Sequence, residues 1–130
     1  MDQRGLYADS SFHFNLIGGF MNGIIKIGSE DVGMTANAAS PFIYRNIFHE
    51  DFLRETQKKD FDPAIMVKMG FVMAMQNAKP MSEVSKLTES AFYEWLEKFE
   101  PLDVMMASGD ISNLYMGQTV KTSSPKNEDA

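Results

Sequence analysis

The run His49-Glu50-Asp51 is the only cluster in the sequence that could bind a metal ion or act as a general base. An imidazole beside two carboxylates offers the donor types of both sites. The run is predicted to be helical, and on a helix only residues three or four apart share a face, so these side chains point in different directions. The other histidine, His13, lies in a segment without a clear pattern, which leaves no three-ligand zinc site. We interpret the cluster as a solvated helix face.

The remaining enzyme signatures are also weak. Glu94 and Glu97 have the spacing of two carboxylates on one helix face, but a charged solvent face is the commoner interpretation. Ser40 lies between Ala39 and Pro41 without a G-x-S-x-G turn, and the glycines match no phosphate-binding loop. The chain has no cysteine, which excludes thiol catalysis, disulfides and thiolate metal sites. We predict a protein that is not an enzyme and has no metal or cofactor.

The composition predicts one acidic globular domain. The chain has 130 residues, of which 44% are hydrophobic and 23% charged. The net charge is −6 and no Lys/Arg run offsets it, which argues against nucleic-acid binding because phosphates require cations. No apolar run approaches the roughly 20 residues that span a bilayer, and residues 1–5 lead into no signal-peptide core. We expect no nucleic-acid or membrane partner and a cytoplasmic location.

The patterning predicts a mainly α fold, in which a short N-terminal β-hairpin precedes a bundle of about four helices and a disordered C-terminal tail. Residues 1–20 are polar and aromatic without a period, and we assign them no structure. Residues 24–28 are predicted to form a strand, residues 29–31 a turn, and residues 32–36 a weaker return strand.

The first helix is predicted to run from Ser40, a good N-cap followed by Pro41, to about Gln57. Apolar residues recur along it at spacings of three and four. They are Tyr44, Ile47, Phe48 and Phe52.

The second helix is predicted from Asp62-Pro63 to about Ala78, where Pro80 ends it. It is apolar nearly all round, so it is either buried at the centre of the domain or covered by another chain. The sequence contains 11 methionines, and methionine-rich surfaces repack around varied partners. One hypothesis is a partner-binding surface made of the helix methionines, and the alternative is that they all lie in the core. These residues are Met66, Met69, Met73 and Met75.

Residues 81–87 are predicted to form a loop or short turn. Thr88 is predicted to cap a third helix. Pro101 opens a fourth helical segment, which we expect to break at Gly109-Asp110 before a last turn. The third helix has an apolar face made of Phe92, Trp95, Leu96 and Phe99.

The domain is expected to comprise residues 21–117, followed by a flexible tail of residues 118–130 that is polar and rich in Ser and Lys. Residues 1–20 are interpreted as a non-native or disordered extension, with natural synthesis beginning at Met21. Residues 17–19, Ile-Gly-Gly, can be encoded with a ribosome-binding sequence just ahead of this methionine. The alternative is a genuine disordered extension.

Residues 38–52 resemble the start of the tail assembly chaperones of long-tailed phages and prophages of Gram-positive bacteria. That pattern has a small-residue run, a Tyr-Arg pair, Phe-Gly, and an acidic residue two positions later. Tyr44, Arg45, Phe48 and Asp51 match it. His49 stands where the pattern has glycine, at a position predicted to be mid-helix, where His is no worse than Gly. The resemblance covers roughly residues 22–117, and its later segments follow in order: residues 71–75, 92–96 and 113–115.

The resemblance implies a chaperone that binds the tape measure protein and keeps it soluble in the host cytoplasm while tail tube subunits assemble around it. It implies absence from the mature virion and partner contacts at the four matching residues. It also implies a longer frameshifted form that recruits tail tube protein, and Pro125-Lys126-Asn127 can encode a slippery heptamer. Self-association into a homo-oligomer is left open. The alternative is a small phage structural or regulatory protein without chaperone activity.

Overall fold

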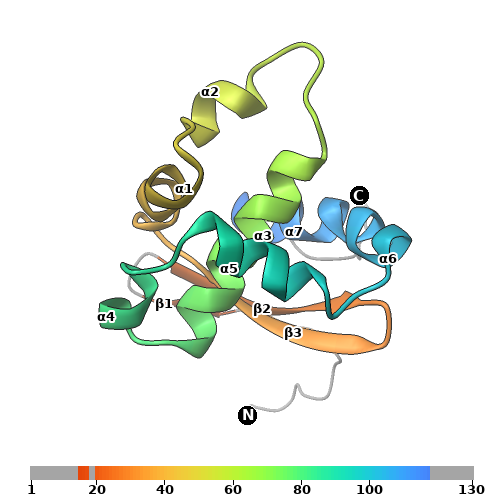
Figure 1. Cartoon of the computed structure of the whole chain (residues 1–130), viewed down its shortest axis with the longest axis horizontal. Coiled ribbons are helices and arrows are strands. Elements are labelled where there is room, and N and C mark those ends of the chain that lie inside the picture. The colour runs from red at the N-terminus through yellow and green to blue at the C-terminus, as the bar shows by residue number, and fades with distance from the viewer. Residues whose placement is uncertain (1–14, 18–19, 118–130) are drawn as a thin grey trace.

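The computed structural model describes residues 15–17 and 20–117, in which an antiparallel sheet carries a layer of helices on one face (Figure 1). The predicted order, a hairpin followed by helices in a mainly α fold, is confirmed. The strands are β1 (Asn15–Ile17), β2 (Phe20–Ile27) and β3 (Glu30–Ala36). The helices are α1 (Ser40–Phe48), α2 (Phe52–Thr56), α3 (Ala64–Ala78), α4 (Met81–Val84), α5 (Glu89–Leu96), α6 (Pro101–Met106) and α7 (Ser108–Tyr115).

β2 and β3 form the predicted hairpin, but its turn lies at Gly28-Ser29 and not at residues 29–31. Gly28 has a φ of 63°, a left-handed conformation that glycine supplies at the first position of a two-residue hairpin turn. Glu30 therefore pairs with Ile27. Alternate residues on the inner face of the sheet are buried against the helices. They are Met21, Ile25, Ile27, Met34 and Ala36.

The prediction of no structure in residues 1–20 is wrong for the described part of that segment. Asn15–Ile17 pairs antiparallel with the beginning of β2, which starts at Phe20, so the backbone hydrogen bonds of the sheet extend across Met21. Residues 1–14 and 18–19, and the predicted tail at residues 118–130, lie outside the described residues. Natural synthesis from Met21 stays a prediction.

The single first helix predicted from Ser40 to Gln57 is wrong, because the chain forms two helices there. His49 follows α1 in the left-handed conformation, with a φ of 59°, and its N–H bonds to the carbonyl of Arg45. This geometry ends a helix. Asp51 is extended and its carboxylate accepts a hydrogen bond from the N–H of Arg54, which starts α2. An apolar period of three and four continues across the break, so periodicity alone does not reveal it.

Ser40 is the first residue of α1 and its hydroxyl does not cap the helix as predicted. The buried hydroxyl instead accepts a hydrogen bond from the N–H of Asn37 and donates to Oε1 of Gln76, at 2.6 Å. Gln76 in turn donates to Oδ1 of Asn37. This network satisfies the buried hydroxyl and fastens the β3–α1 connection to the end of α3.

α3 is the central helix, and it is buried within the domain itself. It contacts β3, α1, α7, α5 and α6, so its apolar surface is covered on several sides (Figure 1). Gly70 allows α7 to approach closely, because a Cβ there would lie 2.7 Å from Cδ1 of Ile111. Aromatic rings fill the space between α1, α3 and α5, with centroids 5–7 Å apart. They include Phe48, Phe71, Phe92 and Trp95.

The later part of the chain has more helices than predicted. Residues 81–87, predicted to be a loop or short turn, contain the one-turn helix α4. The predicted break at Gly109-Asp110 is wrong, because both residues lie in the first turn of α7. The break falls at Ala107, whose side chain is buried between α6 and α7. Within the described ranges, none of the helices has the length and hydropathy needed to cross a membrane.

Candidate functional site

The residues of the Tyr-Arg pattern have structural roles around the α1–α2 break. Tyr44 is buried, and its hydroxyl donates a 2.7 Å hydrogen bond to Oε1 of Glu50. Lys68 Nζ lies 3.4 Å from both Glu50 oxygens and 5.2 Å from the ring centroid of Phe48. Burial, and then the Glu50 carboxylate, raise the pKa of Tyr44 far above its ordinary value. Tyr44 therefore remains a neutral donor and is not a general base.

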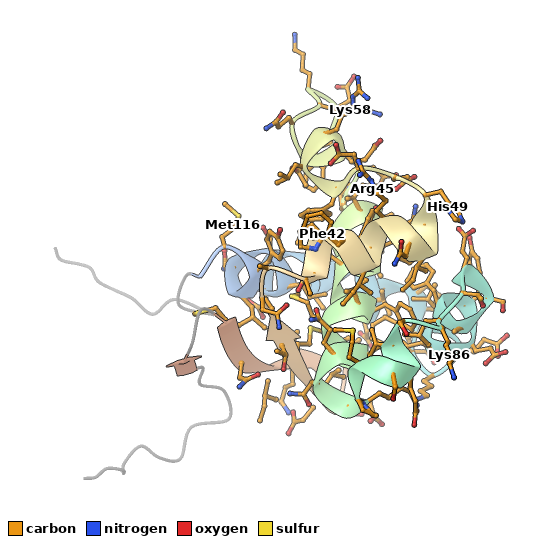
Figure 2. All side chains as sticks on the ribbon, turned by 90° about the vertical axis from the view of Figure 1, so that its left-hand side faces the viewer. Phe42, Arg45, His49, Lys58, Lys86 and Met116 are labelled. Atoms are coloured by element: carbon orange, nitrogen blue, oxygen red, sulfur yellow. The ribbon has the colours of Figure 1, made fainter. Side chains whose placement is uncertain are left out.

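The four matching residues divide into two buried and two exposed. Tyr44 and Phe48 are 0% and 6% exposed, so neither offers a surface for a partner in this fold. Arg45 and Asp51 are exposed, and Nη2 of Arg45 lies 3.6 Å from Oδ2 of Asp51. Figure 2 shows Arg45 and His49 on the surface around α1. Of the four residues predicted to contact a partner, only Arg45 and Asp51 are therefore accessible in this fold. They form a weak ion pair across the helix break.

We predict that His49→Gly stabilises the protein by about 1 kcal/mol, because a side chain at φ 59° crowds the backbone and glycine does not. The exposed side chain of His49 removes little surface from water, so its loss costs little. Urea unfolding measures the difference. The control is Asn46→Gly, three residues earlier within α1 and also exposed, where glycine should destabilise by about 0.3 kcal/mol because asparagine is itself a weak helix former. If both variants change the free energy of unfolding in the same direction, the left-handed conformation of residue 49 is contradicted.

The methionines of α3 lie mainly in the core, in agreement with the core alternative. Met66, Met69 and Met73 are 4%, 0% and 0% exposed, and Met75 is half-buried. Their side chains are covered because α3 passes through the middle of the domain. Met66, Met69 and Met73 therefore offer no exposed surface in this fold, and a partner contact at these methionines stays a prediction.

A different group of large apolar side chains is exposed, and it lies on α5 and α6. Tyr93 is 55% exposed, Leu102 68%, Met105 41% and Met106 73%. Leu102, Met105 and Met106 are three and four residues apart, so they share one face of α6. A contiguous exposed apolar face of this kind is typical of an interaction site.

A groove of about 450 Å³ lies beside this face, between α3, α5 and α6. Tyr93 and Met105 line it and also belong to the exposed group, so groove and face form one continuous surface. Lys68 is its only charged lining residue, and it is paired with Glu50. We call this surface the α5–α6 surface, defined by the lining residues Ala64, Val67, Lys68, Phe92, Tyr93, Leu96, Phe99, Pro101, Val104 and Met105 together with Leu102 and Met106.

A second hollow of about 390 Å³ lies between α2, the start of α3 and α7. It mixes exposed apolar residues such as Leu53 and Met116 with the polar residues Thr56, Gln57 and Ser112. Its lining is more polar, so the α5–α6 surface is the better site for an apolar partner.

Glu94 and Glu97 are both exposed, as expected of a solvent face. In the part of the chain that the structure describes, no three or more His, Asp or Glu side chains gather as metal ligands.

Sequence reasoning included the residues of α6 in a helical segment but did not identify them as a surface. One signal was present: Leu102, Met105 and Met106 are three and four residues apart, so a helix through them has an apolar stripe besides the buried Val104.

Scans against protein-family models, curated protein sequences and solved structures return no match.

Proposed function

We propose that this protein is a tail assembly chaperone of a long-tailed phage or prophage, which binds the tape measure protein in the host cytoplasm and is absent from the mature virion. The observation that carries the proposal is the α5–α6 surface, an open apolar groove with exposed Tyr, Leu and Met side chains on an acidic domain. Such a surface covers the apolar face of a helix without a stereospecific pocket. The net charge of −6 helps to keep the complex soluble.

The residues of the sequence resemblance also support the proposal. The pattern has glycine at position 49, and the structure places a left-handed residue there, the conformation that glycine adopts most easily. Tyr44 and Phe48, which match the pattern, hold this turn against α3. The pattern therefore has the residues that the α1–α2 break needs: glycine at the left-handed position and two aromatic residues that pack beside it.

The test is co-expression with the long helical protein of the same phage. We expect the soluble yield of that protein to rise and the two proteins to co-purify, because the α5–α6 surface covers apolar helix faces. A matched control expresses the long protein with the Leu102→Ser/Met106→Ser variant. These side chains are exposed, so their loss should leave the fold intact and reduce the solubilising effect.

Mass spectrometry of induced cells and of purified particles examines the rest of the proposal. Peptides of this chain should occur in cells and not in particles, and peptides leaving the reading frame near Lys126 would identify the longer form that recruits tail tube protein. No gain in solubility, together with this chain in mature particles, would instead support a structural role.

A further inference from the structure

The polar groups around the α5–α6 surface determine what kind of helix it can accept. Its floor is apolar, and the one charged group there, the Lys68 ammonium, already contacts Glu50 and the ring of Phe48. A charged partner residue would therefore lose water in the floor without gaining an opposite charge. The floor accepts apolar side chains. Since α5 has eight residues and is about 12 Å long, about two turns of a partner helix fit along it.

The rim has the opposite character and is strongly acidic. Residues 89–106 contain five carboxylates and one lysine, but Glu94 and Lys98 line a separate hollow and the Asp103 carboxylate lies beside Gly28. Glu89 begins α5 and Glu97 directly follows it, so the two lie four residues before and after Tyr93. Glu100 lies between two lining residues, Phe99 and Pro101. All three glutamates are exposed. Among the described residues, none of the five carboxylates of this segment forms an ion pair.

We propose that the α5–α6 surface binds an amphipathic helix of the partner protein whose apolar stripe is bordered by Lys or Arg. The stripe fills the groove and covers the face of α6, and the cations lie against the rim carboxylates. The identity of the partner, the tape measure protein, rests on the proposed function. The chemistry expected of the partner helix follows from the apolar floor and the acidic rim of the surface. Complementary rim charges mainly increase the rate and specificity of docking, while the apolar contacts supply affinity.

Charge also argues against the two other occupants, a second copy and a terminal segment of the same chain. Two copies docked through this surface would bring two acidic rims together. Residues 118–130 contain Val120 as their only large apolar residue, and residues 1–14 contain one Arg against two Asp. Neither terminus offers an apolar stripe with cationic borders.

The test uses two synthetic helical peptides of about 18 residues, with leucine at i, i+3, i+4 and i+7 and either Lys or Glu along both borders. Fluorescence anisotropy of labelled peptides measures binding to the whole protein. We expect the Lys-bordered peptide to bind at least about tenfold more tightly than the Glu-bordered peptide, and its affinity to fall as salt is added. The variant Glu97→Lys/Glu100→Lys should reverse the preference.

A second pair of variants tests whether the peptide binds at the α5–α6 surface. Tyr93→Ala/Met105→Ala removes apolar contact from the groove edge and should weaken binding of the Lys-bordered peptide by about tenfold or more. Phe42→Ala/Met81→Ala removes an exposed aromatic residue and an exposed methionine elsewhere, on α1 and α4, and should bind like the unmodified protein (Figure 1). Circular dichroism checks that each variant is folded.

Equal binding of the two peptides, or unchanged binding by Tyr93→Ala/Met105→Ala, would overturn the inference. Self-association that Tyr93→Ala/Met105→Ala abolishes in sedimentation would overturn it in favour of a second copy. The outcomes also separate the two proposals. If the Tyr93→Ala/Met105→Ala variant still solubilises the long helical protein, the docking inference fails and the chaperone function stands. If the peptides bind as expected and the long protein gains no solubility, the function fails and the docking chemistry stands.

Discussion

Replacing Met73 by glutamate is expected to lower the free energy of unfolding severely. Met73 is 0% exposed on α3, the helix that contacts β3, α1 and α7. The substitution removes a buried apolar side chain, and it either buries a carboxylate or shifts its pKa upward until it is neutral. Together these effects should destabilise the fold by at least about 4 kcal/mol, against a total stability of about 5–15 kcal/mol for a typical domain. Far-UV circular dichroism and urea unfolding measure the loss.

The matched control is Met81→Glu, which introduces the same side chain at a methionine that is 51% exposed. Met81 begins α4, where a carboxylate is favourable near the helix N-terminus, so we expect a change of no more than about 0.5 kcal/mol. If Met73→Glu is as stable to urea as the unmodified protein and loses only partner binding, Met73 is an interface residue and the core placement of the α3 methionines is wrong.

The second large effect is expected for Phe71→Ala, which should cost about 3–5 kcal/mol. Phe71 is 1% exposed, and its ring centroid lies 5.5 Å from that of Phe92 and 5.6 Å from that of Trp95. Truncation removes these contacts and leaves a cavity, since the surrounding rings on α1 and α5 cannot close around it fully. Urea titration measures the change in the free energy of unfolding. A soluble quencher should also quench the fluorescence of Trp95 more readily in this variant.

Phe42→Ala is the control for this truncation, because Phe42 is 67% exposed on α1 (Figure 2). Loss of that side chain should change the free energy of unfolding by no more than about 0.5 kcal/mol. A cost for Phe71→Ala as small as that for Phe42→Ala would show that the ring cluster is not a packed core.

The core position of α3 shows why sequence alone left two interpretations open. A helix that is apolar nearly all round is buried, but its composition is the same whether its own domain or another chain covers it. Only the placement of β3, α1 and α7 around α3 decides between them. With α3 covered in this way, exposed methionine appears instead on α6, at Met105 and Met106.

Local sequence was enough to predict the hairpin, the helical character of the chain after it and the positions of the proline-marked helix starts. Side-chain alternation, glycine at the turn and a proline in the first turn act within a few residues, so the local chain carries that information. The breaks at His49 and Ala107 and the α5–α6 surface depend instead on tertiary packing. His49 adopts a conformation that its own side chain disfavours, because the partly buried contacts among Tyr44, Glu50 and Lys68 hold the turn. The groove is formed where α3, α5 and α6 pack together, and the spacing of residues along the chain does not predict which helices pack against each other.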